Sequence, residues 1–83
     1  MYSVRVLRPV IKDIADLPKD YVRLISQHID GLAHDPRPAG ALKLQGETGY
    51  RLRVGVYCVL YDIDDQAHEV IVYRIKHRRD VYR

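Results

Sequence analysis

The chain has 83 residues, of which 47% are hydrophobic and 30% are charged, and its formal net charge at pH 7 is +3. This length and composition predict one small globular domain, residues 1–83. No run reaches the roughly 20 apolar residues of a transmembrane helix, and the start lacks the apolar segment of a secretory signal. We therefore expect a cytoplasmic protein without a membrane partner. The single cysteine, Cys58, excludes an internal disulfide and cannot alone form a structural zinc site.

The first half of the chain predicts a strand followed by two helices. Residues 2–7 alternate between apolar and polar side chains, which is typical of a short strand. A helix is expected from Pro9 to the residue before Pro18, with an apolar stripe formed by Ile11, Ile14, Ala15 and Leu17. A second helix is expected to begin near Pro18, with a stripe formed by Tyr21, Val22, Ile25, Ile29 and Leu32. The segment HDPRPAG, residues 34–40, ends it.

The second half predicts three strands, over residues 50–54, 56–63 and 69–75. Gly55 and residues 64–68 form the short connections between them, so the strands are expected to pair as an antiparallel meander. The predicted fold class is α+β, in the order β-α-α-β-β-β. An N-terminal strand precedes a two-helix hairpin, which packs on a small antiparallel sheet.

Two arginines on the first strand of this meander are the first candidates for a binding site. Arg51 and Arg53 lie on the face opposite Tyr50, Leu52 and Val54, about 6–7 Å apart along the strand. That spacing suits successive phosphate oxygens. A sheet face exposed only to solvent explains the same pattern, because antiparallel sheets commonly have one wet side.

The chain ends in KHRRDVYR, residues 76–83, in which rings alternate with basic side chains. The imidazole of His77 can carry a proton near neutral pH, Tyr82 offers a phenolic proton, and Arg78 and Arg79 offer donors for phosphate. Cleavage of RNA needs such groups, because the 2′-hydroxyl loses a proton, the 5′-oxygen gains one, and the phosphorane carries negative charge. A basic tail that serves only solubility is the alternative.

Cys58 is expected on the same face as Arg51 and Arg53, one strand further on. No cysteine-protease signature surrounds it, so we interpret it as a small packing residue. The other histidines, at positions 28, 34 and 68, are too scattered to indicate a metal site. No cofactor is expected.

The segments LKLQGETGYRLRVGVYCVLYDID and VIVYRIKHRRDVYR together resemble the RelE/ParE toxin superfamily, and the RelE branch more than the ParE branch. The resemblance implies the toxin of a type II toxin–antitoxin system. Such a toxin is a metal-independent mRNA interferase, an endoribonuclease that cuts messages in the ribosomal A site. The implied partners are a RelB-like antitoxin, the ribosome and mRNA, with operator DNA contacted only through the antitoxin complex.

Carried over by position, the family's catalytic residues fall on Arg51, Arg53, Arg78 (or Arg79) and Tyr82, and we add His77 to them. We expect further RNA contacts from four other basic residues of these segments, which are Lys43, Lys76, Arg79 and Arg83.

Two departures from the family pattern bear on activity. Cys58 stands where the family usually has an arginine, so one cationic contribution to the transition state is missing. Arginines also replace the lysines of some relatives at positions 51 and 53, and arginine is a poor base. Proton transfer would then fall to His77, Tyr82 or the ribosome. Two other functions stay open, namely a ParE-like inhibitor of DNA gyrase and a catalytically weakened relative that only binds its antitoxin and operator.

Overall fold

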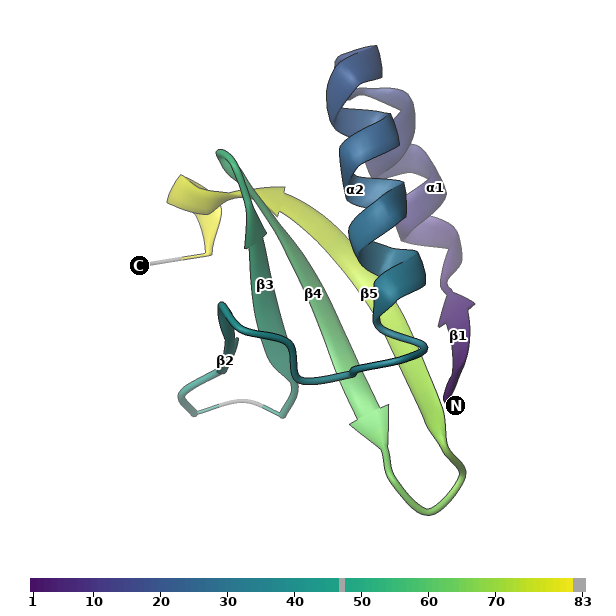
Figure 1. Ribbon diagram of the computed structural model, residues 1–83. Coiled ribbons are helices and arrows are strands. Elements are labelled where there is room, and N and C mark those ends of the chain that lie inside the picture. Colours follow the sequence, from purple (N-terminus) through teal and green to yellow (C-terminus); the bar gives the residue numbers. More distant parts are fainter. Residues whose placement is uncertain (47, 82–83) are drawn as a thin grey trace.

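The structure is a computed structural model that describes residues 1–46 and 48–81. Its elements in chain order are β1 (Ser3–Val6), α1 (Arg8–Ala15), α2 (Lys19–Gly31), β2 (Ala41–Lys43), β3 (Tyr50–Val54), β4 (Tyr57–Asp64), β5 (Glu69–His77) and the 3₁₀ helix η1 (Arg78–Asp80). The strands form one sheet in the order β1-β5-β4-β3-β2. Both helices cover the same side of this sheet (Figure 1). We call that side the helix face and the opposite side the open face.

The predicted α+β class, the helical hairpin and the meander β3-β4-β5 are confirmed, but the sheet is mixed rather than antiparallel. β1 pairs with β5 in parallel, from Ser3 opposite Glu69 to Val6 opposite Val72. Parallel neighbours need a long connection, and the helices and three intervening strands provide it. The sequence did not predict β2, because three residues are too few to show an alternating pattern.

α1 ends at Ala15 and α2 begins at Lys19, so Pro18 separates the two helices as predicted. The expected stripe of α1 is wrong at Ile11 and Ala15, which are both exposed. Ile11 is 62% exposed, whereas Val10 is fully buried. Val10 and Ile14 lie four residues apart on one side of the helix and pack on the core, so Ile11 is turned aside. In α2 the predicted residues Ile25 and Ile29 are buried.

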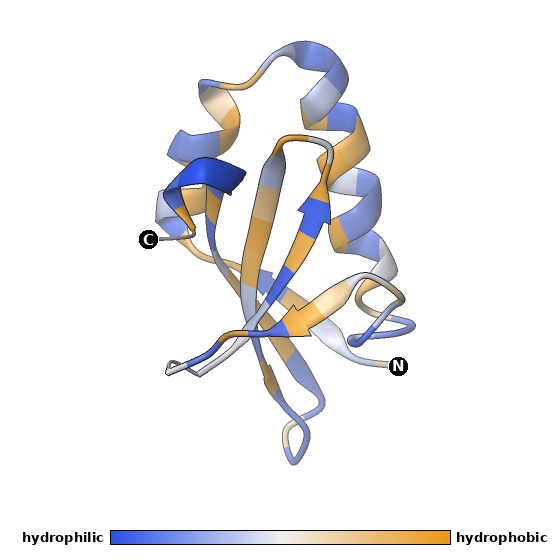
Figure 2. Cartoon of the chain, turned by 90° about the vertical axis from the view of Figure 1, so that its left-hand side faces the viewer, coloured by the Kyte–Doolittle hydropathy of each residue, from blue (hydrophilic) through white to orange (hydrophobic). Residues whose placement is uncertain are grey.

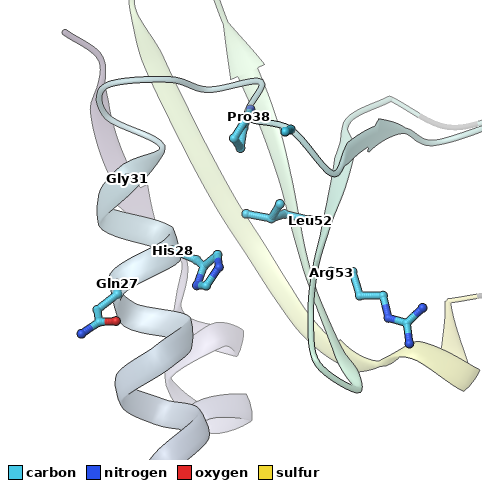
Figure 3. A pocket seen from close by; sticks show the side chains of 7 residues that line it. Gln27, His28, Gly31, Pro38, Leu52 and Arg53 are labelled. Atoms are coloured by element: carbon cyan, nitrogen blue, oxygen red, sulfur yellow. The ribbon is translucent and has the colours of Figure 1, made fainter.

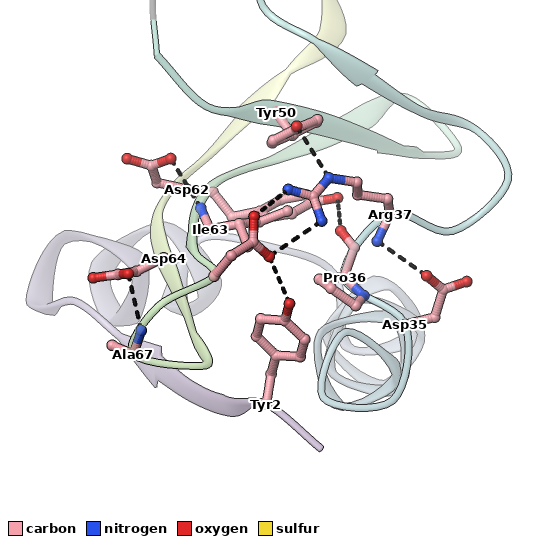
Figure 4. Close-up of polar contacts among 11 residues, drawn as sticks. Tyr2, Asp35, Pro36, Arg37, Tyr50, Asp62, Ile63, Asp64 and Ala67 are labelled. Carbon is pink, nitrogen blue, oxygen red and sulfur yellow. Dashed lines mark hydrogen bonds and ion pairs between the residues drawn. The ribbon is translucent and has the colours of Figure 1, made fainter.

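A network of tyrosine and arginine side chains holds the loop between α2 and β2 against the sheet (Figure 4). Tyr61 is fully buried, and its hydroxyl donates to the carbonyl of Pro36 at 2.8 Å. Burial raises the pKa of Tyr61 to about 12, so it stays a donor at physiological pH. Arg37 binds the carboxylate of Asp65 at 2.8 Å and the hydroxyl of Tyr50 at 3.1 Å. These bonds fix the end of the sheet away from η1.

Asp13 of α1 closes the edge of β5 beyond the end of β1. Its Oδ2 accepts the backbone N–H of Ile75 at 2.9 Å and the Nε of Arg74 at 2.9 Å. Burial alone would raise the pKa of Asp13, but the hydrogen bonds from Arg74 and Ile75 and the positive charges of Arg74 and Lys76 outweigh it and lower that pKa. The carboxylate therefore replaces a strand partner that β1 does not supply.

Replacing Asp13 by Ala should lower the free energy of unfolding by about 1–3 kcal/mol, because a partly buried N–H loses its acceptor. Urea unfolding at neutral pH measures this change. In the unmutated protein the contribution is present above the ordinary carboxyl pKa and is lost as the pH falls through the lowered value. Asp13→Asn is the matched control, since it keeps an acceptor and should lose mainly the acid-dependent part. Equal stability of all three proteins would contradict this role of Asp13.

Candidate functional site

The register of β3, β4 and β5 brings basic side chains together on the open face. Arg53 pairs with Cys58, and Cys58 pairs with Lys76, so these three residues form one row across the sheet. Arg51 lies one pleat along β3 on the same face. Neighbouring strands are about 4.8 Å apart, which places the backbones of Arg53 and Lys76 roughly 10 Å apart. Figure 2 turns this face to the viewer and shows hydrophilic segments of β3 and η1 on either side of β4.

The turn between β3 and β4 orients Arg53. The Nε of Arg53 donates to the carbonyl of Gly55 at 2.9 Å. Gly55 has a φ of 62°, and a Cβ at this position would collide with the ring of Tyr21. A glycine is therefore required here for both conformation and packing, and the turn holds the Arg53 side chain near the end of the sheet.

Cys58 occupies the middle of the basic row without contributing charge. It lies on the open face, as the sequence predicted, yet it is fully buried. Leu60, the next residue on this face, is 7% exposed. Both residues are absent from the core cluster of the helix face. The thiol therefore acts as a packing residue beneath the longer side chains of the face.

Residues 76–81 are part of the fold rather than a frayed tail. Lys76 and His77 are the last residues of β5. The backbone N–H of Arg78 donates to the carbonyl of Val56 at 2.7 Å, which ties η1 to the β3–β4 turn. Arg78 and Arg79 are exposed there. Two more cations thus lie at the end of the sheet where Arg53 is held.

His77 lies on the other side of the sheet from this row. It pairs with Tyr57, which pairs with Val54, and all three side chains belong to the helix face. The His77 ring packs edge-on against Tyr57 at 5.6 Å between centroids. Its Nδ1 accepts the backbone N–H of Arg79 at 3.3 Å, and His77 thereby caps η1. This contact requires an unprotonated Nδ1.

The structure does not place the other residues predicted for the site among the basic residues of the open face. Lys43 lies in the row with Tyr50 and Tyr61 on the helix face, exposed at the edge of the sheet and turned away from Arg51 and Arg53. Tyr82 and Arg83 lie outside the described residues. Of the nine residues predicted from sequence, the structure brings Arg51, Arg53 and Lys76 together, with Arg78 and Arg79 alongside.

The pairing of Lys76 with Cys58 was missed by sequence reasoning. A bulge shifts the register between β4 and β5, so that Leu60 pairs with Arg74 while Tyr61 pairs with Val72. The bulge leaves Tyr73 as an extra residue and reverses the alternation of β5 beyond it. A strict alternation counted from Val72 would put Lys76 on the helix face. The adjacent Tyr73-Arg74 pair offers no clear signal of a bulge.

A groove of about 470 Å³ separates α2 from β3 and reaches Arg53 from the helix side (Figure 3). Its lining consists of Gln27, His28, Gly31, Pro38, Ala39, Leu52 and Arg53. The guanidinium of Arg53 turns away from α2, toward the C-terminal segment. Arg53 therefore belongs to the rim of this groove and to the open face at once.

Chemically, the open face suits an anion. Its charged row consists of cations, and arginine forks bind phosphate oxygens in two-point contacts. Within residues 1–46 and 48–81, no three histidine, cysteine or carboxylate side chains are grouped so that they could hold a metal ion. None of the helices in this part of the chain is long and apolar enough to cross a bilayer.

Comparisons with known proteins agree with this architecture. The family described as "ParE toxin of type II toxin-antitoxin system, parDE" matches residues 4–82. The toxin RelG of Mycobacterium tuberculosis is 31% identical over 84 residues, which cover 99% of this chain and 97% of RelG. The toxin–antitoxin complex RelBE2 of M. tuberculosis contains a chain with a TM-score of 0.82 and 29% identity, covering 93% of this chain and 98% of that one. The archaeal RelE–RelB complex of Pyrococcus horikoshii gives a TM-score of 0.80 and 28% identity, with 93% and 94% covered.

Proposed function

This chain belongs to the RelE/ParE superfamily of type II toxins, and on that premise we propose that it is a ribosome-dependent endoribonuclease that cleaves mRNA in the A site. The observation that carries the proposal is the cationic open face, where Arg51, Arg53 and Lys76 lie together. A message strand bound on this face would place its phosphates among these side chains. The site of action and the location of the protein are then cytoplasmic.

The cations of this face would stabilise the transition state without a metal ion. The 2′-oxygen attacks the adjacent phosphorus, the bond to the 5′-oxygen breaks, and the phosphorane between these steps carries added negative charge. Arg51 and Arg53 would bind its non-bridging oxygens. Lys76, opposite Arg53 across Cys58, would add a third positive charge. Arg78 and Arg79, which are exposed in η1, would bind the neighbouring phosphates.

Proton transfer needs groups other than these arginines, which hold their protons at any ordinary pH. His77 faces the helix side and uses Nδ1 to cap η1, so we assign it a positioning role for Arg78 and Arg79. Tyr82, close to the end of the chain, remains the candidate proton donor on the protein. Ribosomal RNA groups are the other source.

An antitoxin is the expected protein partner. Two of the similar structures are complexes of a toxin with a RelB-type antitoxin, and we propose a RelB-like partner for this chain. Contact with operator DNA would then run through the antitoxin complex. DNA gyrase is the second candidate target, favoured by the ParE description of the matching family and by the uncharged Cys58 in the basic row.

The test is expression of the chain without its antitoxin. Growth should stop, and messages should show new 5′ ends inside their reading frames. The control is a reporter message whose start codon is removed, because an untranslated message should stay intact. Growth arrest with uncut messages and induced DNA-damage signalling would instead select gyrase as the target. Normal growth at high expression would indicate a relative that only binds its antitoxin.

A further inference from the structure

A second cationic site lies at the edge of β5 that faces α1, next to Arg74, which shares a row of the open face with Leu60 and Arg51. It is a pocket of about 450 Å³ between α1 and β5, lined by Arg8, Pro9, Lys12, Asp13 and Arg74. It exists because β1 ends at Val6, so that α1 rather than a strand packs beside the last part of β5. The mechanism proposed above makes no use of these residues.

The charges in this pocket do not cancel. Arg74 binds Asp13 through Nε at 2.9 Å and Nη2 at 3.3 Å, so one cation is compensated and held in place. Within the described part of the chain, Arg8 and Lys12 have no ion-pair partner. They lie four residues apart on α1 and therefore project on the same side of the helix. Two positive charges remain uncompensated in a concave site, where neighbouring low-dielectric walls strengthen the local field.

Lys76 connects this pocket to the open face. Its side chain shares a row with Arg53, and its charge is one of those that act on Asp13 inside the pocket. Cationic groups thus follow one another around the edge of β5, from Arg53 through Lys76 to Arg74 and on to α1. RNA that is bound on the open face would therefore contact the cations at this edge of β5 next.

We propose that the pocket formed by Arg8, Lys12 and Arg74 binds a backbone phosphate of RNA. The inference rests on the proposed function, because it supplies a second anchor for the RNA that the open face contacts. Asp13 holds the Arg74 guanidinium at the wall of the pocket, and Arg8 and Lys12 provide the net charge. The recognised group is a phosphodiester, from either the single-stranded message or a duplex of ribosomal RNA.

The experiment measures binding of the full chain to short fluorescent 2′-O-methyl RNAs, one single-stranded and one hairpin, as a function of salt. Blocking the 2′-oxygen separates binding from cleavage. The variant is Arg8→Gln/Lys12→Gln. Its control is Lys19→Gln/Arg23→Gln, which removes the same charge at the same spacing from exposed positions of α2. Loss of the one phosphate contact that this pocket makes should reduce the slope of log K against log salt by about 0.7 on the single strand and about 0.9 on the hairpin.

A reduced slope for Arg8→Gln/Lys12→Gln with an unchanged control supports the proposal, and the RNA that shows it identifies the source of the phosphate. Equal losses in both pairs would mean a general charge effect and would overturn the proposal. Unchanged RNA binding with weaker binding of a RelB-like antitoxin would assign the pocket to a protein partner and also overturn it.

A third variant separates this inference from the proposed function. Arg51→Gln/Arg53→Gln should weaken binding of the same RNAs through the open face. If only this variant loses affinity, the edge pocket is excluded and the open face stands. If only Arg8→Gln/Lys12→Gln loses affinity, the pocket stands and the proposed face fails.

Discussion

Replacing Arg51 and Arg53 together by Gln is expected to slow ribosome-dependent cleavage of a message by at least about 10²-fold. Loss of a single preorganised donor to a developing oxyanion typically costs about 10²–10³-fold in rate, and this variant removes two guanidinium groups. The expected loss lies in the rate of the bound complex more than in affinity, because phosphorane charge develops only during the reaction. Single-turnover cleavage on stalled ribosomes at saturating toxin measures it.

The comparison depends on keeping the fold intact. Arg53 is exposed, and its Nε donates to the turn carbonyl of Gly55, so urea unfolding of the variant must accompany the rate measurement. Lys19→Gln/Arg23→Gln has the same net charge and changes exposed residues of α2. That control should cleave at the unmutated rate. Equal activity of the two variants would show that the strand arginines do not take part in the chemistry.

The meander could be predicted because its local signals agree. Residues 50–54 alternate strictly, and Gly55 marks a turn that only glycine fits, since a Cβ would meet Tyr21. The same alternation correctly placed Arg51, Arg53 and Cys58 on one face. These predictions depend only on the period of a strand and on turn stereochemistry.

What the sequence could not show depends on contacts between distant segments. The parallel pairing of β1 with β5 follows from packing of the whole chain, and so does Asp13 as the acceptor for Ile75. The bulge before Arg74 decided which side of the sheet Lys76 and His77 occupy. The sequence predicts His77 and Tyr82 as the proton carriers of the chain, and only the register shows that His77 lies beside Tyr57.

Replacing Cys58 by Arg is expected to raise the cleavage rate by about tenfold or more, the opposite of the usual effect of a mutation at a buried position. Cys58 lies between Arg53 and Lys76 in one row, so a guanidinium at this position would reach the centre of the cationic face. One well-placed donor is worth up to about 10²–10³-fold, and repulsion from two neighbouring cations reduces that gain. The same single-turnover assay measures the change.

The cost of this substitution should appear in stability. Like charges directly opposite each other on neighbouring strands destabilise a sheet by about 0.2–1 kcal/mol per pair, and the thiol that Arg displaces is fully buried. Cys58→Met is the control, because it changes size without adding charge and should cleave like the unmutated protein. If Cys58→Arg brings no gain while Lys76→Gln reduces cleavage, Lys76 already supplies the charge that the family's arginine provides. If neither substitution changes the rate, the row does not stabilise the transition state, and the catalytic part of the proposal fails.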